Sequence, residues 1–312
     1  MLLDGLRATP ALDFVEFPTL ESFEASHVLG DARNTPLSGR CGAARAQVVL
    51  PSCHLTVQRT FPRVLEMNYR SSGTLCIVPL IPSIDVRING IAGSGSHVMT
   101  VRGEATCEII EPEANLFAFL NLSPAISERD WPGSADQMRI VEIHNLGALQ
   151  SFRRTVENLL AFASLQLVPV HDLDMLRSFE EALLSSLDEA MISNVAVPSP
   201  RHFGRYLRIV RRVDEYLSCR QATSINLPDL ARVCDVSIRT LQNAVIAVRG
   251  LSVHQYLRRR RLWSVRQSLA SGRSIIKISD VARSYGFWHM GEFSAAYRAI
   301  FGESPSDTLK AS

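Results

Sequence analysis

Hydrophobic positions in the last third of the chain recur at spacings of three and four residues, and the same arrangement occurs twice. A recurrence of this kind predicts amphipathic helices that each bury one stripe. The two copies align with a shift of 52 residues over most of their length and of 51 residues at a central turn, so one register slip separates them. The matching positions are Ala231, Asp235, Leu241, Val245, Gly250, Ser252 and Leu257 in the first copy, and Ala282, Gly286, Phe293, Tyr297, Gly302, Ser304 and Leu309 in the second.

Each copy has the spacing of a helix-turn-helix unit. A small residue, Ala231 or Ala282, allows a second helix to cross closely, and the chain must reverse about four residues later. Gly286 suits that reversal because glycine takes positive φ without strain, and Asp235 stands there in the first copy because Asp enters this region more readily than most residues. Ser237 is expected to cap the next helix. The face of that helix opposite its apolar stripe is then free to enter a groove of DNA.

The first 200 residues show a different rhythm. Short segments rich in β-branched and apolar residues are separated by Gly, Pro, Ser or Asn, and no ten-residue helical pattern lies between them. This predicts an antiparallel β sandwich or barrel rather than a parallel βαβ array. The expected strands are residues 46–50, 54–60, 64–69, 74–80, 84–88, 97–101, 106–110 and 116–122.

Two helical patterns follow, at residues 149–167 and 173–191, with Pro169 between them. They predict an αα-hairpin, which could pair across a two-fold axis or pack on its own sheet. The uncharged segment 193–200, with two prolines, predicts a partly stiff linker. The fold class is therefore α+β with two domains: an N-terminal antiparallel sandwich or barrel with an αα-hairpin (1–192), a linker (193–201), and a C-terminal all-α domain with two helix-turn-helix units (202–312).

The charge distribution changes the picture, because a net charge of +2 hides two parts of opposite sign. Residues 201–312 hold 19 Lys and Arg against 8 Asp and Glu, whereas the first 200 residues hold 14 against 23. A basic domain can bind phosphates and release their counterions. The sequence thus indicates double-stranded DNA as the partner of the last third, and an acidic control module in the first 200 residues.

Several short runs in the last third carry a family signature. They are Gly-Leu-Ser at 250–252, Tyr-Leu-Arg-Arg-Arg-Arg-Leu at 256–262, Ile278, Val-Ala at 281–282, Gly-Phe at 286–287, Phe293, Phe-Gly at 301–302 and Ser-Pro at 304–305. With these runs, residues 206–309 resemble the DNA-binding domain of the AraC/XylS family of bacterial transcription regulators. Within that family, residues 286–293 are similar to the corresponding stretch of the ethanolamine-operon regulator, which suggests ethanolamine as one candidate effector.

The resemblance implies a function and an architecture. Two helix-turn-helix units joined by a linker helix, expected over residues 251–269, would place their recognition helices in major-groove segments about 34 Å apart. The first domain would be the sensor and dimerisation half. The chain is then expected to be a cytoplasmic, homodimeric transcription regulator, more often an activator, that binds promoter DNA and RNA polymerase and responds to a small-molecule effector.

The exposed positions of each second helix supply the candidate DNA contacts. Arg can pair with guanine, and Gln or Asn with adenine, through two hydrogen bonds each. In the second unit Glu292 would repel phosphate, and Ala295 stands where the family often has arginine, so this unit is expected mainly to position the protein. Met290 is expected to face outward as well. The predicted base-reading residues are Arg239, Gln242, Asn243, His289 and Glu292, and the predicted phosphate contacts are Ser237, Thr240, Arg283 and Arg298.

The four arginines at 258–261 leave two interpretations open. They could form a solvated helix face with one arginine in a structural ion pair, or they could contact phosphate.

Enzymatic and metal-binding functions find little support. Cys53 and His54 could suggest a thiol nucleophile, but adjacent residues of a strand point to opposite faces. No nucleophile elbow, phosphate loop or zinc-binding helix is present, and no C-x-x-C spacing occurs. His97 and His144 are isolated. The six cysteines, Cys41, Cys53, Cys76, Cys107, Cys219 and Cys234, are expected to be reduced and buried.

No stretch predicts a membrane span or a signal peptide, and no cofactor is expected. No set of residues marks the effector site. Two rival functions remain open: a regulator whose first half binds a protein, and a DNA-architectural protein with little sequence preference.

Overall fold

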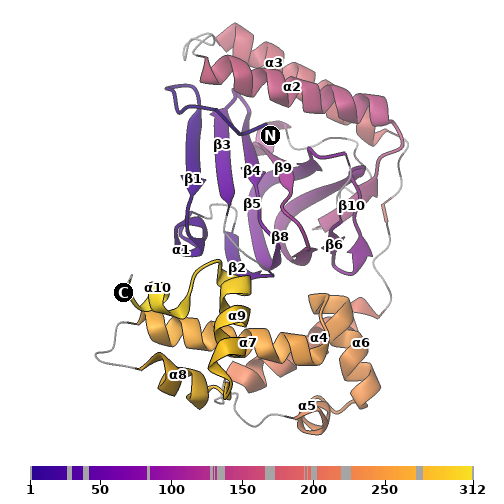
Figure 1. The fold of residues 1–312 in the computed structure, drawn as a ribbon. Helices are drawn as coiled ribbons and strands as arrows, with labels where there is room; N and C mark the ends of the chain where they lie inside the picture. The colour runs from indigo at the N-terminus through magenta and orange to yellow at the C-terminus, as the bar shows by residue number, and fades with distance from the viewer. Residues whose placement is uncertain are drawn as a thin grey trace. The chain divides into compact units, whose positions relative to one another are not determined.

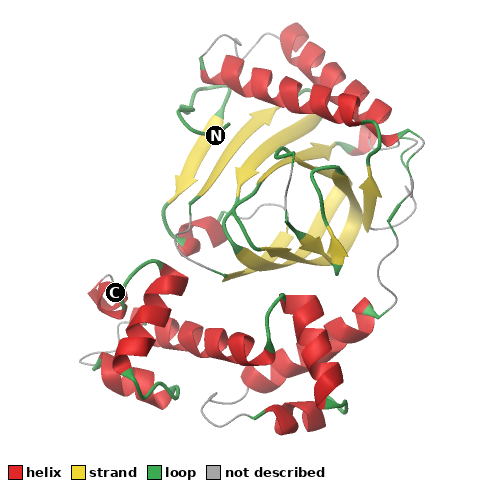
Figure 2. Cartoon of the chain, turned by 45° about the vertical axis from the view of Figure 1, so that its right-hand side comes forward, coloured by secondary structure: helices red, strands yellow, loops and turns green. Residues whose placement is uncertain are grey.

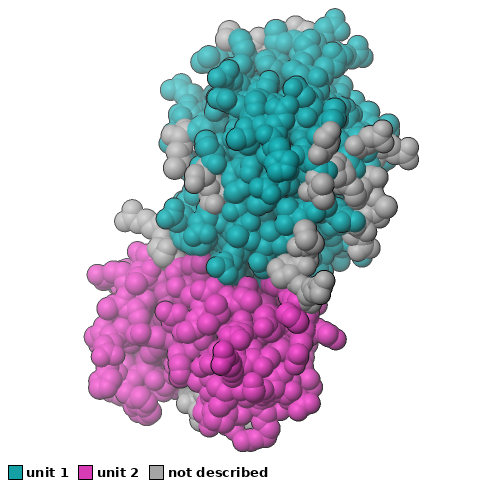
Figure 3. Space-filling model, turned by 90° about the vertical axis from the view of Figure 1, so that its right-hand side faces the viewer, with its two compact units in different colours: residues 1–35, 41–198 teal, residues 36–40, 199–312 magenta. Residues whose placement is uncertain are grey.

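The computed structural model divides into two compact units, residues 1–35 with 41–198 and residues 36–40 with 199–312 (Figures 1 and 3). The structure describes residues 2–26, 30–37, 42–82, 85–126, 129, 131, 138–165, 173–192, 194, 196–197, 202–218, 226–271 and 277–310. The predicted linker prolines, Pro169, Cys41 and Cys219 lie outside these residues.

The first unit is built on one antiparallel sheet of ten strands that curls on itself (Figures 1 and 2). Neighbouring strands follow the order β1-β3-β4-β9-β5-β8-β6-β7, while β10 pairs with β8 and β2 with β5. The strands are β1 Asp13–Phe17, β2 Gly30–Pro36, β3 Ala43–Val49, β4 Cys53–Arg59, β5 Arg63–Pro79, β6 Arg87–Ile88, β7 Ile91–Ala92, β8 His97–Glu111, β9 Leu116–Leu122 and β10 Met138–Glu142; a short helix α1, Leu20–Glu24, follows β1 and a 3-10 turn, Pro124–Ile126, follows β9.

Side chains alternate between two hydrophobic cores, one on each face of the sheet. In β9, Ala118 and Leu120 belong to the core beneath the helices, and Phe117 and Phe119 belong to the core enclosed by the curled sheet. This period of two is the one expected when both faces of a strand are covered. The predicted sandwich or barrel is confirmed.

The αα-hairpin packs on its own sheet. Helix α2, Leu146–Ser164, and helix α3, Leu173–Met191, lie side by side across the sheet (Figures 1 and 2). Phe152 and Leu159 of α2 and Leu187 of α3 join the same core as the strands beneath them. Of the two arrangements that the sequence left open, packing on the sheet therefore accounts for the buried stripes.

Four of the predicted strands are in fact halves of two long strands. Residues 64–69 and 74–80 are both part of β5, and residues 97–101 and 106–110 are both part of β8. Polar residues in the middle suggested loops, but β5 and β8 pair along most of their length, with a register shift between Ser71 and Thr74. Gly73 lies at that shift. A side chain does not fit there, because a Cβ would approach the Leu122 carbonyl oxygen to 1.9 Å. Strands β1, β2, β7 and β10 were not predicted, and of the described residues 85–88 only 87–88 form a strand.

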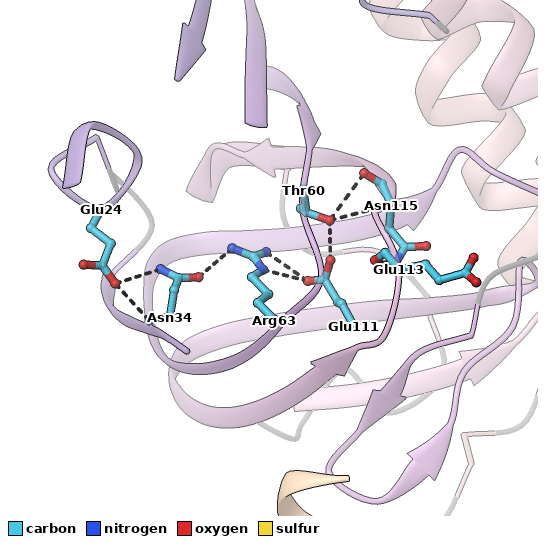
Figure 4. A network of polar contacts seen from close by, with 7 residues as sticks. All are labelled: Glu24, Asn34, Thr60, Arg63, Glu111, Glu113 and Asn115. Atoms are coloured by element: carbon cyan, nitrogen blue, oxygen red, sulfur yellow. Dashed lines mark hydrogen bonds and ion pairs between the residues drawn. The ribbon is translucent and has the colours of Figure 1, made fainter. Parts of the chain in front are cut away.

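A buried polar network ties α1 and β2 to the sheet (Figure 4). Arg63 and Glu111 are only 2% and 1% exposed, and Arg63 Nη2 lies 2.9 Å from Glu111 Oε1. Arg63 also donates to Asn34 Oδ1 at 2.7 Å, and Glu24 accepts from Asn34 in turn. Thr60 donates to the second oxygen of Glu111. Removing one member of such a pair costs about 3–5 kcal/mol, so this network fixes one arrangement of the α1 segment.

Over the described residues from 202 to 310, the second compact unit is built from helices. Its helices are α4 Phe203–Ser218, α5 Leu227–Val233, α6 Ile238–Arg249, α7 Val253–Ala270, α8 Ile278–Ser284, α9 Met290–Phe301 and α10 Pro305–Lys310. They enclose two cores, and α7 contributes its first part to one and its second part to the other.

Candidate nucleic-acid interface

The first helix-turn-helix unit consists of α5, a tight turn and α6. Asp235 has a φ of +54°, as its place in the turn requires, and the Val236 N–H donates to the Ala231 carbonyl oxygen at 3.0 Å. Ser237 caps α6 by accepting from the Thr240 N–H at 3.1 Å. The Leu241 stripe of α6 is buried against α4 and α7. The predicted turn and cap are confirmed.

The second unit repeats this geometry with α8 and α9. Gly286 has a φ of +81°, and the Phe287 N–H donates to the Ala282 carbonyl oxygen at 3.0 Å, as in the first unit. Phe293 and Tyr297 are fully buried and pack edge to face at a ring-centroid distance of 5.7 Å. The N-cap of α9 is His289, whose side chain makes no capping hydrogen bond. The repeat seen in the sequence is thus a repeat of structure.

Helix α7 joins the two units. Val253 and Tyr256 pack in the first core, whereas Leu262, Val265 and Leu269 pack in the second. Because both cores share one uninterrupted helix of 18 residues, α7 sets the distance between the recognition helices.

Within the described residues, the four arginines at 258–261 form no ion pair. Arg258 is exposed and the other three are partly buried, and Arg261 lies over the Phe287 ring at 5.4 Å. Burial lowers the pKa of Arg259 and of Arg261. The less exposed ion pairs of this domain involve Arg249 and Arg266, and the exposed Arg232 and Arg283 pair within their own helices, so the ion pair suggested at residues 258–261 does not form among the described residues.

A buried polar cluster secures α6 to its neighbours. Arg249, the last residue of α6, is 4% exposed, and its Nη2 lies 2.6 Å from Asp214 Oδ2 of α4. The Tyr256 hydroxyl of α7 donates to the other oxygen of Asp214. Burial and the adjacent Asp214 carboxylate raise the pKa of Tyr256, so the hydroxyl keeps the proton that it donates. Sequence reasoning missed this cluster, because its members are separated by 35 and 42 residues.

The predicted base-reading residues of the first unit share one face of α6. Arg239, Gln242 and Asn243 are all exposed. Two isoleucines beside them, Ile238 and Ile246, were not among the predicted contacts and are 42% and 47% exposed. The free face of α6 therefore offers hydrogen-bonding groups flanked by apolar ones.

The free face of α9 is less polar. His289 and Glu292 are exposed, as is Ala295. Met290 is partly buried against the second core, so the expectation that it faces outward is wrong. Trp288, which was not among the predicted contacts, is 71% exposed.

Of the predicted phosphate contacts, Ser237, Arg283 and Arg298 are exposed and Thr240 is partly buried. The hydroxyls of Ser237 and Thr240 lie 2.9 Å apart at the start of α6. Arg283 is exposed and 3.6 Å from Asp280 one turn earlier, a type of surface pair that contributes little to stability and leaves the arginine accessible. Arg298 is exposed near the end of α9.

The suggested pair of Cys53 and His54 does not come together in the sheet unit (residues 1–35 with 41–198). Cys53 is buried and His54 is exposed, so the two side chains face opposite sides of β4. Cys53, Cys76, Cys107 and Cys234 are all buried free thiols, as predicted. No group of three or more potential ligands is placed to hold a metal ion within the described part of the chain. Among the described helices, none has both the length and the apolar character needed to cross a membrane.

Two open pockets of about 560 Å³ each flank α2 in the sheet unit. One lies between α2 and α3 and is lined by Asn158 and Phe179 among others. The other is lined by Arg153, Arg154 and Ser96 among others. Both volumes fall within the range of about 300–1,000 Å³ that is usual for small-molecule sites.

Comparison with known proteins places these features in a family. Residues 230–311 match a helix-turn-helix domain family. The XylDLEGF operon transcriptional activator 1 of Pseudomonas putida is 30% identical over 191 residues, which cover 61% of this chain and 57% of that protein. The XylDLEGF operon transcriptional activator 2 of the same species is 34% identical over 132 residues, which cover 42% of this chain and 82% of that protein.

A probable AraC family transcriptional regulator of Rhodopseudomonas palustris has a solved structure that is 32% identical to this chain, covers 33% of it and 96% of its own length, and superposes with a TM-score of 0.32. The family assignment rests on the sequence matches. The match to the first of these activators spans little more than half of its length. The duplicated helix-turn-helix and the identity over most of the second activator together show that the chain belongs to the AraC/XylS family of DNA-binding transcription regulators.

Proposed function

We propose that the chain is a sequence-specific transcription regulator that acts as an activator. Its sheet unit (residues 1–35 with 41–198) binds a small-molecule effector, and its helical domain (residues 202–312) binds promoter DNA. The observation that carries this proposal is the pair of recognition helices α6 and α9, each with a buried stripe and an exposed face, in a domain with 19 basic and 8 acidic residues. Activators of the XylDLEGF operon are its relatives. The proposed cellular partners are double-stranded DNA and RNA polymerase in the cytoplasm.

Most of the sequence reading is assigned to α6, and the second helix-turn-helix unit is expected mainly to position the protein. Arg239, Gln242 and Asn243 offer donors and acceptors that match guanine and adenine edges, each good pair contributing about 1–3 kcal/mol of discrimination. In α9, His289 and Glu292 are the proposed base contacts. Phosphate contacts are proposed for Ser237, Thr240, Arg283 and Arg298, which lie on the surface of the two units.

The experiment is selection of bound sequences from a random duplex pool by the full-length protein, with and without a panel of small amines, aromatic acids and sugars. A motif of two elements about one helical turn apart, shifted or sharpened by one compound, supports the proposal. Salt-sensitive binding without any enriched motif would support the architectural alternative. A motif that no compound changes, but that a bound protein does, would support control by a protein partner.

Variants test the division between the two helices. Gln242→Ala is expected to relax sequence preference at one position, whereas Glu292→Ala is expected to change it less. Asp229→Ala, in the first turn of α5 and outside both recognition helices, serves as the matched control. Full preference in Gln242→Ala together with loss in Glu292→Ala would contradict the division.

A homodimer is also proposed. The ends of the hairpin keep large apolar side chains in solvent, with Leu165 68% and Leu173 56% exposed after the stripe on the sheet is buried. Leu165→Asp is therefore expected to shift the protein toward monomer in sedimentation velocity, and Val49→Asp, an equally exposed site on β3, is not. Equal behaviour of the two variants would contradict this assignment of the interface.

A further inference from the structure

The turn of the second helix-turn-helix unit holds one residue more than the turn of the first. Val236 and Phe287 are equivalent, because each donates its N–H at 3.0 Å to the alanine of the preceding helix. Ser237 and His289 are equivalent, because each is the N-cap of a recognition helix. Ser237 follows Val236 directly, whereas Trp288 stands between Phe287 and His289. The additional residue of the second unit is therefore a tryptophan.

This tryptophan is left in solvent although its neighbours are not. Trp288 is 71% exposed, more than any other large apolar side chain that the structure describes. The next aromatic residues along the chain, Phe287 and Phe293, are 8% and 1% exposed and pack in the second core. The core thus takes up the rings on both sides of Trp288, and the insertion carries the indole outward.

Burial and hydrogen bonds hold the backbone on both sides of Trp288 in place. Phe287, the residue before it, is buried, and its N–H donates to the Ala282 carbonyl oxygen. His289, the residue after it, accepts a hydrogen bond from the Phe293 N–H at 2.9 Å. A tryptophan has two side-chain torsions, so a fixed backbone leaves little conformational entropy to lose on binding. The side chain is exposed at the entry of α9, beside the predicted base contact His289.

The place and the chemistry of this residue point to DNA. The N-terminal residues of a recognition helix contact base edges, and Trp288 directly precedes the N-cap of α9. An apolar side chain there recognises the 5-methyl group of thymine, the one apolar feature of the major groove. On the proposed function, we infer that Trp288 is a specificity-determining residue of the second unit, and that its indole packs against a thymine 5-methyl group in the major groove.

The test uses the full-length protein and the duplex recovered by selection, with dissociation constants from fluorescence anisotropy of labelled DNA. Trp288→Ala removes the indole, and Trp288→Phe keeps an aromatic surface. Val49→Ala, at a site in β3 of the sheet unit that is 64% exposed, is the matched control. A second duplex carries uracil in place of thymine within the half-site of α9, which deletes only the methyl groups.

Trp288→Ala is expected to weaken binding to the selected duplex by about 10-fold, and Trp288→Phe and Val49→Ala by clearly less. Uracil substitution is expected to weaken binding by the wild-type protein and to leave binding by Trp288→Ala unchanged. The slope of affinity against salt concentration stays the same, because no charge is removed.

Unchanged affinity in Trp288→Ala, equal loss on random duplex, or equal sensitivity of both proteins to uracil would overturn the inference. These outcomes presuppose a wild-type protein that selects a sequence. A wild-type protein that selects none refutes the proposed function, so the two failures are distinguishable.

Discussion

Replacing Arg249 tests whether the buried cluster with Asp214 holds the first recognition helix in place. Arg249→Met keeps an apolar stem of similar length but removes the guanidinium that lies 2.6 Å from Asp214 Oδ2. Asp214 would keep the hydroxyl of Tyr256 as a donor, in a site where its side chain is 13% exposed. Breaking a buried pair by removing one partner costs about 3–5 kcal/mol, and the remaining donor favours the lower end, about 3 kcal/mol.

The expected loss is large enough to measure locally. About 1.4 kcal/mol corresponds to a factor of ten in an equilibrium constant. Amides of α4 and α6 that exchange when the first helix-turn-helix unit opens should therefore exchange about 100-fold faster in Arg249→Met. Hydrogen–deuterium exchange with peptide resolution reports these helices separately from the sheet unit. Arg232→Met is the matched control, since Arg232 is 76% exposed in its pair with Asp229 and such a pair contributes at most about 1 kcal/mol.

A further variant separates the loss of attraction from the cost of an unpaired charge. In Asp214→Leu/Arg249→Met/Tyr256→Phe all three polar groups are replaced by apolar ones, and stability is expected to return to within about 1 kcal/mol of the wild type. Exchange in Arg249→Met that is no faster than in Arg232→Met would refute the reasoning. So would a triple variant that is less stable than Arg249→Met, because the cluster would then act by attraction rather than by satisfying a buried carboxylate.

Three further predictions concern the turn, the thiols and one acidic residue. Gly286→Ala should destabilise the second unit by about 1–2 kcal/mol, because an L-residue is strained at a φ of +81°, and exchange at α8 and α9 will show it. Burial raises the pKa of Cys76 and of Cys107 to about 12, so iodoacetamide at pH 8 should alkylate neither thiol until urea unfolds the protein, as mass spectrometry can follow. Burial alone would raise the pKa of Asp188, but hydrogen bonds from Arg129 and Trp131 and the arginine charge outweigh it and lower the pKa. The stability contributed by Asp188 is therefore present above about pH 4 and lost as the pH falls through the lowered pKa, so the difference in urea midpoint between wild type and Asp188→Asn should shrink in acid; a constant difference would speak against the pair.

Features set by neighbouring residues could be predicted without the structure. The turn at Gly286, the left-handed Asp235 and the Ser237 cap follow from backbone preferences and from hydrogen bonds spanning three to five residues. Helix α3 has the predicted bounds, because an unbroken apolar stripe at helical spacing specifies both its extent and its buried face. The exposure of Arg239 and Gln242 follows from the same rule, since they lie between the buried positions of α6.

Features set by distant residues could not be predicted. The polar stretch at residues 70–74 suggested a loop, but pairing with neighbouring strands, mainly β8, keeps it extended within β5. Met290 and Trp288 are two residues apart and both are large and apolar, yet the second core covers the first and leaves the second in solvent.

The sequence by itself therefore determined the two helix-turn-helix units, the charge of the DNA-binding domain and the alternation of the sheet, because each depends on local periodicity or composition. Tertiary structure alone decided the strand order, the sheet-facing side of the α2–α3 hairpin and the Asp214–Arg249 pair. The physical reason is that burial and pairing depend on which surfaces the whole chain brings together, and that choice is made by contacts between residues far apart in the sequence.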